Sequence, residues 1–392
     1  MGATGLRNEL LRRVPPGGTI AIGDGVGTVG PLADGTDAFT EISTAAREIG
    51  DVRLVLGWLV APAEGLDTSA FASVTAMMPG WGTRDVLAQD HCDFVPGRLS
   101  GWRSLLADVL RPDVLITRVA RVGSRHCLTS EVSWQLELAE SGVPVLGVSC
   151  GRWTAAPAHP LPGASLTIAA TAADTPRTVA ETEPTDLHTE LAQRVAAHIP
   201  DGARLQYGPG ALGTALLRSA TRPLVIDTGM LTDAVIDLQR NGMLAAAPTA
   251  TYLFGSERLH EWAAGRDILQ PVGFTHDIGR LAAGAPFVAV NTAIEIDPVG
   301  NVNVEGIGDK VVGGIGGHPD YMTAGHLSRG GLSVIAVPST RRGTSPLVPQ
   351  LSRPVSTPAH DVDLVVTERG SADLRGLGWG ARQDALERLF NL

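Results

Sequence analysis

Two stretches with the same layout decide the fold of this chain. Residues 16–30 read PGGTIAIGDGVGTVG, and residues 200–213 read PDGARLQYGPGALG. In each stretch a proline-led turn is followed by a short run suited to a β-strand and then by glycines in the spacing Gly-x-Gly-x-x-Gly. The repeat predicts two similar lobes, each beginning with one strand and one glycine loop. Chance similarity between glycine-rich turns is the alternative interpretation.

The composition is that of a globular chain large enough for two lobes. The 392 residues exceed one ordinary core, at ~150 residues per domain, and 44% of them are hydrophobic while 18% are charged. Such values lie well away from those of disordered chains. The formal net charge is −10 and no run of five like charges occurs, so nucleic acid is not an expected partner.

Cysteine usage and hydropathy favour a cytoplasmic protein. The three cysteines, Cys92, Cys127 and Cys150, show neither CxxC nor metal-ligand spacing, which argues against a disulfide framework and against a metal site. Residues 1–13 lack the apolar run of a signal peptide, and no segment reaches the ~18 apolar residues that span a bilayer. No membrane association is therefore expected.

Hydrophobic periodicity predicts the α/β class. Short β-branched runs alternate with longer stretches of helical periodicity, which is typical of an open, largely parallel sheet. Proline, alanine and threonine become frequent over residues 154–185, so we expect an irregular crossing there, with lobes at residues 1–185 and 186–392. The expected strands are 19–22, 52–56, 114–117, 143–148, 224–226, 288–290, 332–337 and 362–366; the expected helices are 38–49, 101–110, 130–141, 186–198, 210–219, 232–241 and 258–264.

Two short motifs have competing interpretations. Gly-x-Gly-x-x-Gly after a strand is the dinucleotide fingerprint, but it occurs twice, and residues 31–35 (PLADG) do not begin a helix after the first copy. Tight turns, or a loop approached by another ligand, are the alternatives to a nicotinamide enzyme. Residues 147–151 (GVSCG) match the serine nucleophile elbow. Two prolines follow where the elbow needs a helix, so Ser149 is also interpreted as a buried strand end.

A glycine run marks the densest functional signal. Residues 313–317 read GGIGG and are followed by His318. Such a run presents backbone N–H groups without side-chain obstruction, which suits an oxyanion hole or the close passage of a pantetheine arm. A flexible hairpin is the alternative.

In this region the sequence resembles the acetyl-CoA hydrolase/CoA-transferase family, which includes 4-hydroxybutyrate CoA-transferases. The motifs fall in the family's order over residues 180–385 and more loosely over the first 150 residues. They are DGARLQYGPGA (201–211), FGSERL (254–259), NTAIEID (291–297), GNVN (300–303), GIGG (314–317), RGG (329–331), IAVPST (335–340) and TERG (367–370). The resemblance implies two similar parallel-sheet lobes of the NagB/RpiA-like type, with acyl-CoA in the cleft between them.

The resemblance also implies roles for individual residues. The loop Gly208, Pro209, Gly210, Ala211 and Leu212 would contact coenzyme A together with Asn291, Gly317 and Arg329. The Gly316 and Gly317 amides would face the thioester oxygen. A coenzyme A thioester would be the substrate, with no tightly bound cofactor. A homodimer is expected by analogy only.

One departure from the family pattern concerns the nucleophile. Relatives place a glutamate at the strand end before a Met-x-x-Asp-x-x-x-Asp-Leu helix, and this glutamate attacks the thioester. Residues 226–238 read IDTGMLTDAVIDL, so Gly229 occupies that position without a gap. Glycine has no side chain that can form a glutamyl-CoA intermediate.

Other acids are candidates for activating a water molecule. Asp227 is two residues earlier, and residues i and i+2 of a strand project from the same face, so its carboxylate is expected in the cleft. Glu295 is a second candidate base, and His318 a third; structural roles are the alternatives. We therefore expect an acyl-CoA-processing enzyme that hydrolyses thioesters. A CoA-transferase with a relocated nucleophile and a non-catalytic CoA-binding protein are the other hypotheses.

Overall fold

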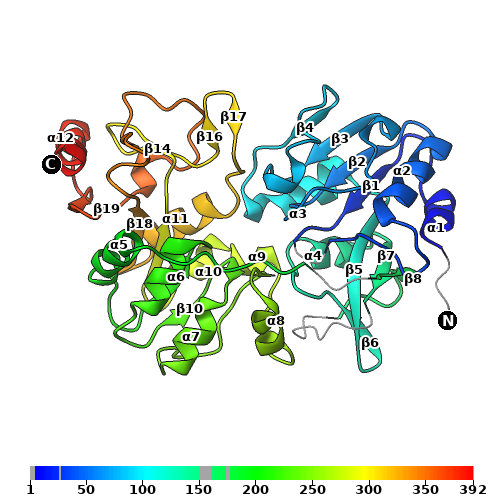
Figure 1. The fold of residues 1–392 in the computed structure, drawn as a ribbon, viewed down its shortest axis with the longest axis horizontal. Helices are drawn as coiled ribbons and strands as arrows, with labels where there is room; N and C mark the ends of the chain where they lie inside the picture. Colours follow the sequence, from blue (N-terminus) through cyan, green and yellow to red (C-terminus); the bar gives the residue numbers. More distant parts are fainter. Residues whose placement is uncertain (1–4, 26–27, 151–159, 174–176, 392) are drawn as a thin grey trace.

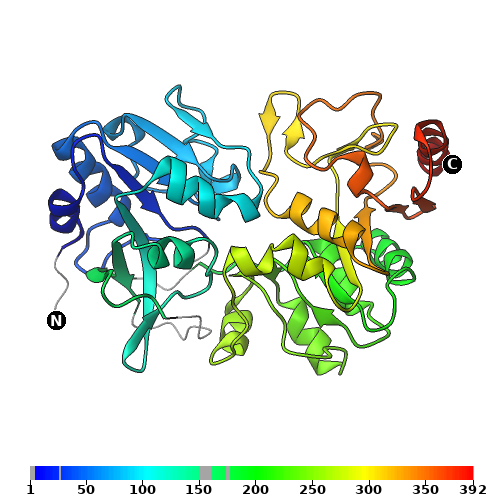
Figure 2. The ribbon, with the colours of Figure 1, turned by 180° about the vertical axis from the view of Figure 1, so that it is seen from behind.

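The structure is a computed structural model that describes residues 5–25, 28–150, 160–173 and 177–391. Its two β-sheets form two halves that lie side by side, the N-terminal half in blue to teal and the C-terminal half in green to red (Figure 1). The chain termini lie at opposite ends of the molecule. Figure 2 shows the same arrangement from behind.

The first sheet is parallel along its main path. Its strand order is β4-β3-β2-β1-β5-β7-β8, and every neighbouring pair in this order is parallel. Strand β6 pairs antiparallel with β5 in a hairpin. The strands are β1 (Thr19–Ile22), β2 (Arg53–Leu56), β3 (Ser73–Ala76), β4 (Cys92–Phe94), β5 (Val114–Val122), β6 (Arg125–Cys127), β7 (Val145–Ser149) and β8 (Leu166–Thr171).

The second sheet repeats the parallel layout. Its order is β10-β9-β13-β18-β19-β20, and only the last pair is antiparallel. The strands are β9 (Arg204–Tyr207), β10 (Val225–Ile226), β13 (Phe287–Asn291), β18 (Leu332–Ala336), β19 (Leu364–Thr367) and β20 (Gly370–Asp373). Three two-stranded pairs accompany it: β11 (Met230–Leu231) with β12 (Tyr252–Leu253), β14 (Glu295–Ile296) with β15 (Val302–Asn303), and β16 (Gly306–Ile307) with β17 (Lys310–Val311).

Helices cover both sheets. In the N-terminal half they are α1 (Leu6–Arg13), α2 (Ala38–Ile49), α3 (Trp102–Ser104) and α4 (Gln135–Glu140). In the C-terminal half they are α5 (Asp186–Ala196), α6 (Ala211–Arg218), α7 (Ala234–Arg240), α8 (Glu257–Ala263), α9 (Val272–Thr275), α10 (Ile278–Ala282), α11 (His318–Leu327) and α12 (Trp379–Asn391). Short 3₁₀ turns lie at Thr68–Ala70, Trp81–Thr83, Leu99–Gly101 and Ala359–Asp361. Leu105–Leu110 is a π-helical turn.

The period-2 alternation of the strands explains how the layers pack. On β13, Phe287 and Ala289 join the cluster that contains Tyr321 of α11, whereas Val288 and Val290 join the cluster that contains Leu191 of α5. Successive side chains of a strand point to opposite faces, so the sheet is buried on both sides, as parallel sheets are. The α5-side cluster continues into the N-terminal half and joins the two sheets through one core.

The α/β class and the parallel sheets predicted from the sequence are confirmed. All eight strands in the predicted set are present, with ends no more than five residues from those expected. In the first sheet β3, β4, β6 and β8 were missed, the last inside the segment predicted to be irregular, and β20 and the three two-stranded pairs of the C-terminal half were also missed. The helix predicted over 130–141 begins only at Gln135, and the one over 101–110 is a mixture of helical types. The division at residue 185 stays a prediction.

Buried polar contacts join the two halves. The hydroxyl of Ser100 donates to Asp320 Oδ1 of α11 at 2.6 Å. Asp24, in the loop after β1, accepts from the hydroxyl of Tyr252 at 2.8 Å, from Ser133 Oγ at 3.1 Å and from Trp134 Nε1 at 3.2 Å, all at Oδ2. These contacts fix the first half against β12 and α11 of the C-terminal half.

Across the residues that the structure describes, no helix is both long and apolar enough to cross a membrane.

Candidate active site

A pocket of about 160 Å³ lies where the two halves meet. It opens at the carboxyl ends of β9 and β13, the edge at which parallel α/β sheets bind ligands. Two side chains of the N-terminal half, Met78 and Leu99, form part of its wall. The other lining residues are Gln206, Tyr207, Gly208, Pro209, Gly229, Met230, Tyr252, His276, Asn291, Gly316, Gly317, His318 and Tyr321.

The loop between β9 and α6 forms one wall of this pocket. Gly208 and Pro209 line both the pocket and a second hollow of about 40 Å³, which Leu212 also lines. Gly210 precedes α6 with φ +106°, a left-handed conformation that favours glycine. Ala211 is the first residue of α6. The loop thus ends at a helix N-terminus, where free N–H groups favour an anionic group such as a phosphate.

Asn291 ends β13 and faces both hollows. Its Nδ2 donates to Gln206 Oε1 at 2.9 Å, and Gln206 Nε2 donates back to Asn291 Oδ1 at 3.2 Å. The paired amides hold each other's orientation in the pocket wall. The structure therefore places Asn291 beside the Gly208–Leu212 loop, and their contact with coenzyme A stays a prediction.

The glycine run 313–317 forms the opposite wall. Gly316 has φ +53°, and its carbonyl accepts from the backbone N–H of Leu99 at 3.3 Å. Gly317 directly precedes α11. A β-carbon at Gly317 would stand 2.3 Å from His276 Nε2, so only glycine fits at this position. Both predicted oxyanion residues, Gly316 and Gly317, line the pocket.

Gly229 lies in the pocket wall just before β11. A β-carbon built on it would stand 3.3 Å from the Tyr321 hydroxyl and 3.4 Å from His276 Nε2. The space beside Gly229 that a longer side chain would enter is therefore bounded by an imidazole and a phenol.

His276 is a pocket residue that no sequence pattern singled out. It lies between α9 and α10, is 1% exposed, and its ring centroid is 4.6 Å from that of Tyr321. Burial, together with the charge of Arg280, lowers its pKa to about 3. The imidazole is therefore neutral near pH 7. His276 belongs to no recognisable motif in the sequence. A histidine followed by an aspartate, as at 276–277, is too common a pair to indicate a site.

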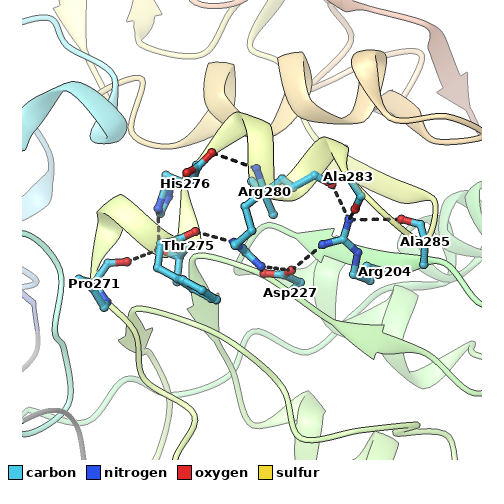
Figure 3. A network of polar contacts seen from close by, with 11 residues as sticks. Arg204, Asp227, Pro271, Thr275, His276, Arg280, Ala283 and Ala285 are labelled. Atoms are coloured by element: carbon cyan, nitrogen blue, oxygen red, sulfur yellow. Dashed lines mark hydrogen bonds and ion pairs between the residues drawn. The ribbon is translucent and has the colours of Figure 1, made fainter.

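Asp227 is not at the pocket. Arg280 holds its carboxylate in a bidentate ion pair, with both distances 2.8 Å, and Arg204 Nη1 lies 3.4 Å away (Figure 3). The regular strand ends at Ile226 and Asp227 forms only an isolated bridge with Thr249. Asp227 and Gly229 therefore do not lie on one regular strand. The expected i, i+2 alternation does not place the Asp227 carboxylate in the cleft.

The same arginine organises the segment that carries His276. Arg280 Nε donates to the carbonyl oxygen of Phe274 at 2.7 Å. Thr275 Oγ1 lies 2.9 Å from His276 Nδ1 and also donates to the carbonyl of Pro271 at 3.3 Å. The ion pair with Asp227 thus connects to the α9–α10 turn and, through it, to the imidazole.

Of the remaining predicted residues, Glu295 and Arg329 do not line the pocket, whereas His318 does. Glu295 Oε2 accepts from Asn303 Nδ2 at 2.7 Å and from the Ser352 backbone N–H at 2.8 Å, which is a structural role in the β14–β15 hairpin. Arg329 is exposed just before β18, at the edge of the sheet opposite the pocket. His318 lines the pocket, but its Nδ1 lies 2.7 Å from Thr357 Oγ1 and its Nε2 lies 3.2 Å from the Thr292 carbonyl.

Two alternative motifs can be followed only in part. Ser149 ends β7, but Gly151 of its elbow and Pro157, the first of the two prolines, lie outside the described residues. The first glycine motif includes Gly27, which also lies outside them. Within the described part of the chain, no three His, Cys, Asp or Glu side chains are grouped as metal ligands would be.

The two sheets and the pocket between them define a protein of the CoA-transferase fold. The crystal structure of RipA from Yersinia pestis matches with a TM-score of 0.84 at 20% identity, over 98% of this chain and 93% of that chain. The 4-hydroxybutyrate CoA-transferase from Porphyromonas gingivalis matches with a TM-score of 0.75 at 20% identity, over 99% and 93%. At these identities the likeness concerns the fold alone.

Sequence comparison gives the family. Residues 255–389 match the acetyl-CoA hydrolase/transferase C-terminal domain. The butyryl-CoA:acetate CoA-transferase of Anaerostipes caccae is 30% identical over 223 residues, which are 52% of this chain and 50% of that protein. Residues 255–389 thus match the family that the resemblance predicted, and the chain spans about half the length of the curated relatives it matches. The correspondence of Gly229 with the family's glutamate stays a prediction.

Proposed function

We propose that the chain is an acyl-CoA-processing enzyme that hydrolyses thioesters by direct attack of water, without a glutamyl-CoA intermediate. The family match of residues 255–389 supports the acyl-CoA substrate. The observation that carries the mechanism is the composition of the pocket wall. Among the described residues that line the pocket there is neither Asp nor Glu, and Gly229 lies in the wall beside the glycine run.

The groups in the pocket wall determine which nucleophile can attack the thioester. Covalent catalysis by this family requires a carboxylate that attacks the thioester carbon. Water is the nucleophile that remains when the wall provides none. The backbone N–H groups of Gly316 and Gly317 would stabilise the negative charge on the thioester oxygen, as in an oxyanion hole. A thiolate is a good leaving group because its conjugate thiol has a pKa of ~8.5.

The pocket walls also favour a class of acyl group. Met78, Leu99 and Tyr252 supply apolar surface, and the pocket volume of about 160 Å³ is below the ~300–1,000 Å³ of sites that enclose drug-sized ligands. In our proposal it holds the thioester and a short apolar acyl chain, while the pantetheine arm follows the Gly208–Leu212 loop outward.

The wider setting belongs to the same proposal. The lobes comprise residues 1–185 and 186–392, and the enzyme works in the cytoplasm, as a homodimer by analogy. It acts on free acyl-CoA without a tightly bound cofactor and without nucleic acid or membrane as partners.

Incubation with acetyl-, butyryl- and octanoyl-CoA tests the proposal. Free CoA is followed with a thiol reagent, and the intact protein mass is measured with and without borohydride. Direct hydrolysis predicts CoA release with no adduct. An acyl or CoA adduct on a carboxylate would instead identify a transferase with a relocated nucleophile, and binding without turnover would identify a non-catalytic CoA-binding protein.

A further inference from the structure

In the pocket wall, the imidazole of His276 lies between Gly229 and Gly317. His276 Nε2 would lie 2.3 Å from a β-carbon at Gly317 and 3.4 Å from one at Gly229. Both glycines therefore leave room for this ring, and His276 lines the pocket beside the predicted oxyanion amides. On the basis of the function proposed above, we propose that His276 is the catalytic acid and base of thioester hydrolysis, held in position by the Asp227–Arg280 ion pair.

The hydrogen bonds around the ring assign its tautomer. Thr275 Oγ1 donates to the Pro271 carbonyl at 3.3 Å, so the same oxygen accepts a proton from His276 Nδ1 at 2.9 Å. Within the described residues Nε2 makes no hydrogen bond. A neutral imidazole with its proton on Nδ1 has its lone pair on Nε2. That lone pair is available to a water molecule in the pocket.

The surroundings keep the ring neutral until the reaction begins. Burial and the positive charge of Arg280 lower the pKa of His276. A developing oxyanion beside the ring acts in the opposite sense, because a nearby negative charge favours the protonated imidazole. The imidazole is therefore expected to take up a proton when the tetrahedral intermediate forms, which is when general base catalysis requires it.

In the proposed hydrolysis, His276 carries one proton from the attacking water to the sulfur of CoA. A lone pair of the water oxygen forms a bond to the thioester carbon, the π electrons move to the carbonyl oxygen, and one water proton moves to His276 Nε2. When the intermediate collapses, the C=O bond re-forms, the C–S bond breaks, and the proton on Nε2 moves to the sulfur of CoA. The products are a carboxylic acid and the CoA thiol, and the imidazole returns to its neutral form.

Arg280 has the geometry of a positioning residue. Its two terminal nitrogens hold Asp227 at 2.8 Å each, and its Nε holds the Phe274 carbonyl two residues before His276. A bidentate arginine fixes direction as well as distance, which lysine cannot do. The other candidate bases are engaged in structural contacts: His318 at both ring nitrogens and Glu295 by Asn303 and Ser352.

His276→Gln tests the catalytic role, with His260→Gln as the matched control. His260 is also buried and has a pKa lowered to about 4 by burial, but it lies on α8 and does not line the pocket. General acid–base catalysis contributes ~10²–10⁴-fold, so His276→Gln should lower kcat by at least 100-fold. Its affinity for a non-hydrolysable CoA thioether should change by less than about threefold. His260→Gln should retain wild-type kcat.

The outcomes separate the two proposals. Absence of CoA release by the wild-type enzyme would overturn the proposed function, whereas wild-type release with an unchanged kcat in folded His276→Gln would overturn only the role of His276. Arg280→Lys should lower kcat while KM stays constant; equal kcat would remove its positioning role. ¹⁵N NMR of the wild-type imidazole needs no variant: protonated Nδ1 and bare Nε2 at pH 7 are expected, and an imidazolium or an Nε2–H tautomer would contradict the assignment.

Discussion

His276 and Gly229 compete for the same space, because a β-carbon at position 229 would stand 3.4 Å from His276 Nε2. A distance of 3.3–3.4 Å, as also to the Tyr321 hydroxyl, admits a methyl group only if the rings shift slightly. We therefore expect this imidazole in its present place and a long side chain at position 229 to exclude each other.

Substitution at Gly229 tests this exclusion. Gly229→Ala should reduce kcat by roughly tenfold, as expected for a small displacement of a catalytic group, and Gly229→Glu should abolish hydrolysis because the carboxylate displaces the imidazole. In the double variant Gly229→Glu with His276→Ala, the side chain gains room beside the thioester. Intact-mass analysis of that variant after incubation with butyryl-CoA should reveal a covalent adduct. Wild-type hydrolysis by the single Gly229→Glu variant would contradict the exclusion.

Removal of the Asp227 carboxylate should cost stability. Asp227→Asn leaves Arg280 and Arg204 without their partner in a largely buried setting, and breaking such a pair costs about 3 kcal/mol of unfolding free energy. Urea unfolding measures the change. The control is Asp373→Asn, whose pair with Arg375 is about half exposed and should contribute less than about 1 kcal/mol. Equal effects of the two variants would show that the buried pair has no special structural role.

Asp24 gives a pH-dependent prediction. Burial raises its pKa to about 7, against the opposing effect of hydrogen bonds from Tyr252, Ser133 and Trp134. Between pH ~4 and ~7 the folded protein therefore keeps a proton on Asp24 that the unfolded chain has lost, so this group's contribution to stability falls as the pH rises through that range. Asp24→Asn cannot titrate.

Urea unfolding of both proteins at pH 4.5 and pH 8 checks the sign. The free energy of unfolding of Asp24→Asn minus that of the wild type should be larger at pH 8 than at pH 4.5, because only the wild type loses stability as the pH rises. The same difference at both values would mean that the Asp24 carboxyl titrates alike in the folded and unfolded states.

The placement of Arg329 predicts a contrast in substrate binding. Because it is exposed at the sheet edge opposite the pocket, Arg329→Ala should leave KM for acyl-CoA within about twofold. Asn291→Ala removes a pocket wall residue and leaves Gln206 unpaired, which should raise KM about tenfold, the effect of losing ~1.4 kcal/mol of binding. A tenfold rise in KM for Arg329→Ala would restore the CoA contact that the family resemblance implies.

The fold could be predicted because its signals are local. Strands such as β1 (TIAI) and β13 (FVAVN) are apolar at every position except one end residue, as both-face burial in a parallel sheet favours. The short β4 reads Cys-Asp-Phe and has no such pattern, because its pairing with β3 depends on tertiary context. The helix expected to begin at Ser130 starts five residues later since Ser130, Glu131 and Ser133 use their side chains in buried polar contacts.

The candidate site could be predicted where glycine runs or a family motif mark it, as at Asn291. The Gly208–Gly213 and Gly313–Gly317 segments show their need for close approach directly in the sequence, and both reach the pocket. His276 left no such trace, because its role depends on which residues the α9–α10 turn brings beside it. Asp227 was assigned from strand periodicity, which fails once the strand ends at Ile226.

A single turnover of butyryl-CoA in H₂¹⁸O tests the central claim most directly, with enzyme in excess over substrate. Direct attack by water places one ¹⁸O atom in the butyrate released and none in the protein. Attack by an enzyme carboxylate, followed by hydrolysis of a protein-bound thioester, would instead leave ¹⁸O in a specific Asp or Glu peptide. Mass spectrometry of butyrate and of the digested enzyme distinguishes the two: labelled butyrate with unlabelled protein is the predicted result, and a labelled carboxylate in the protein would contradict it.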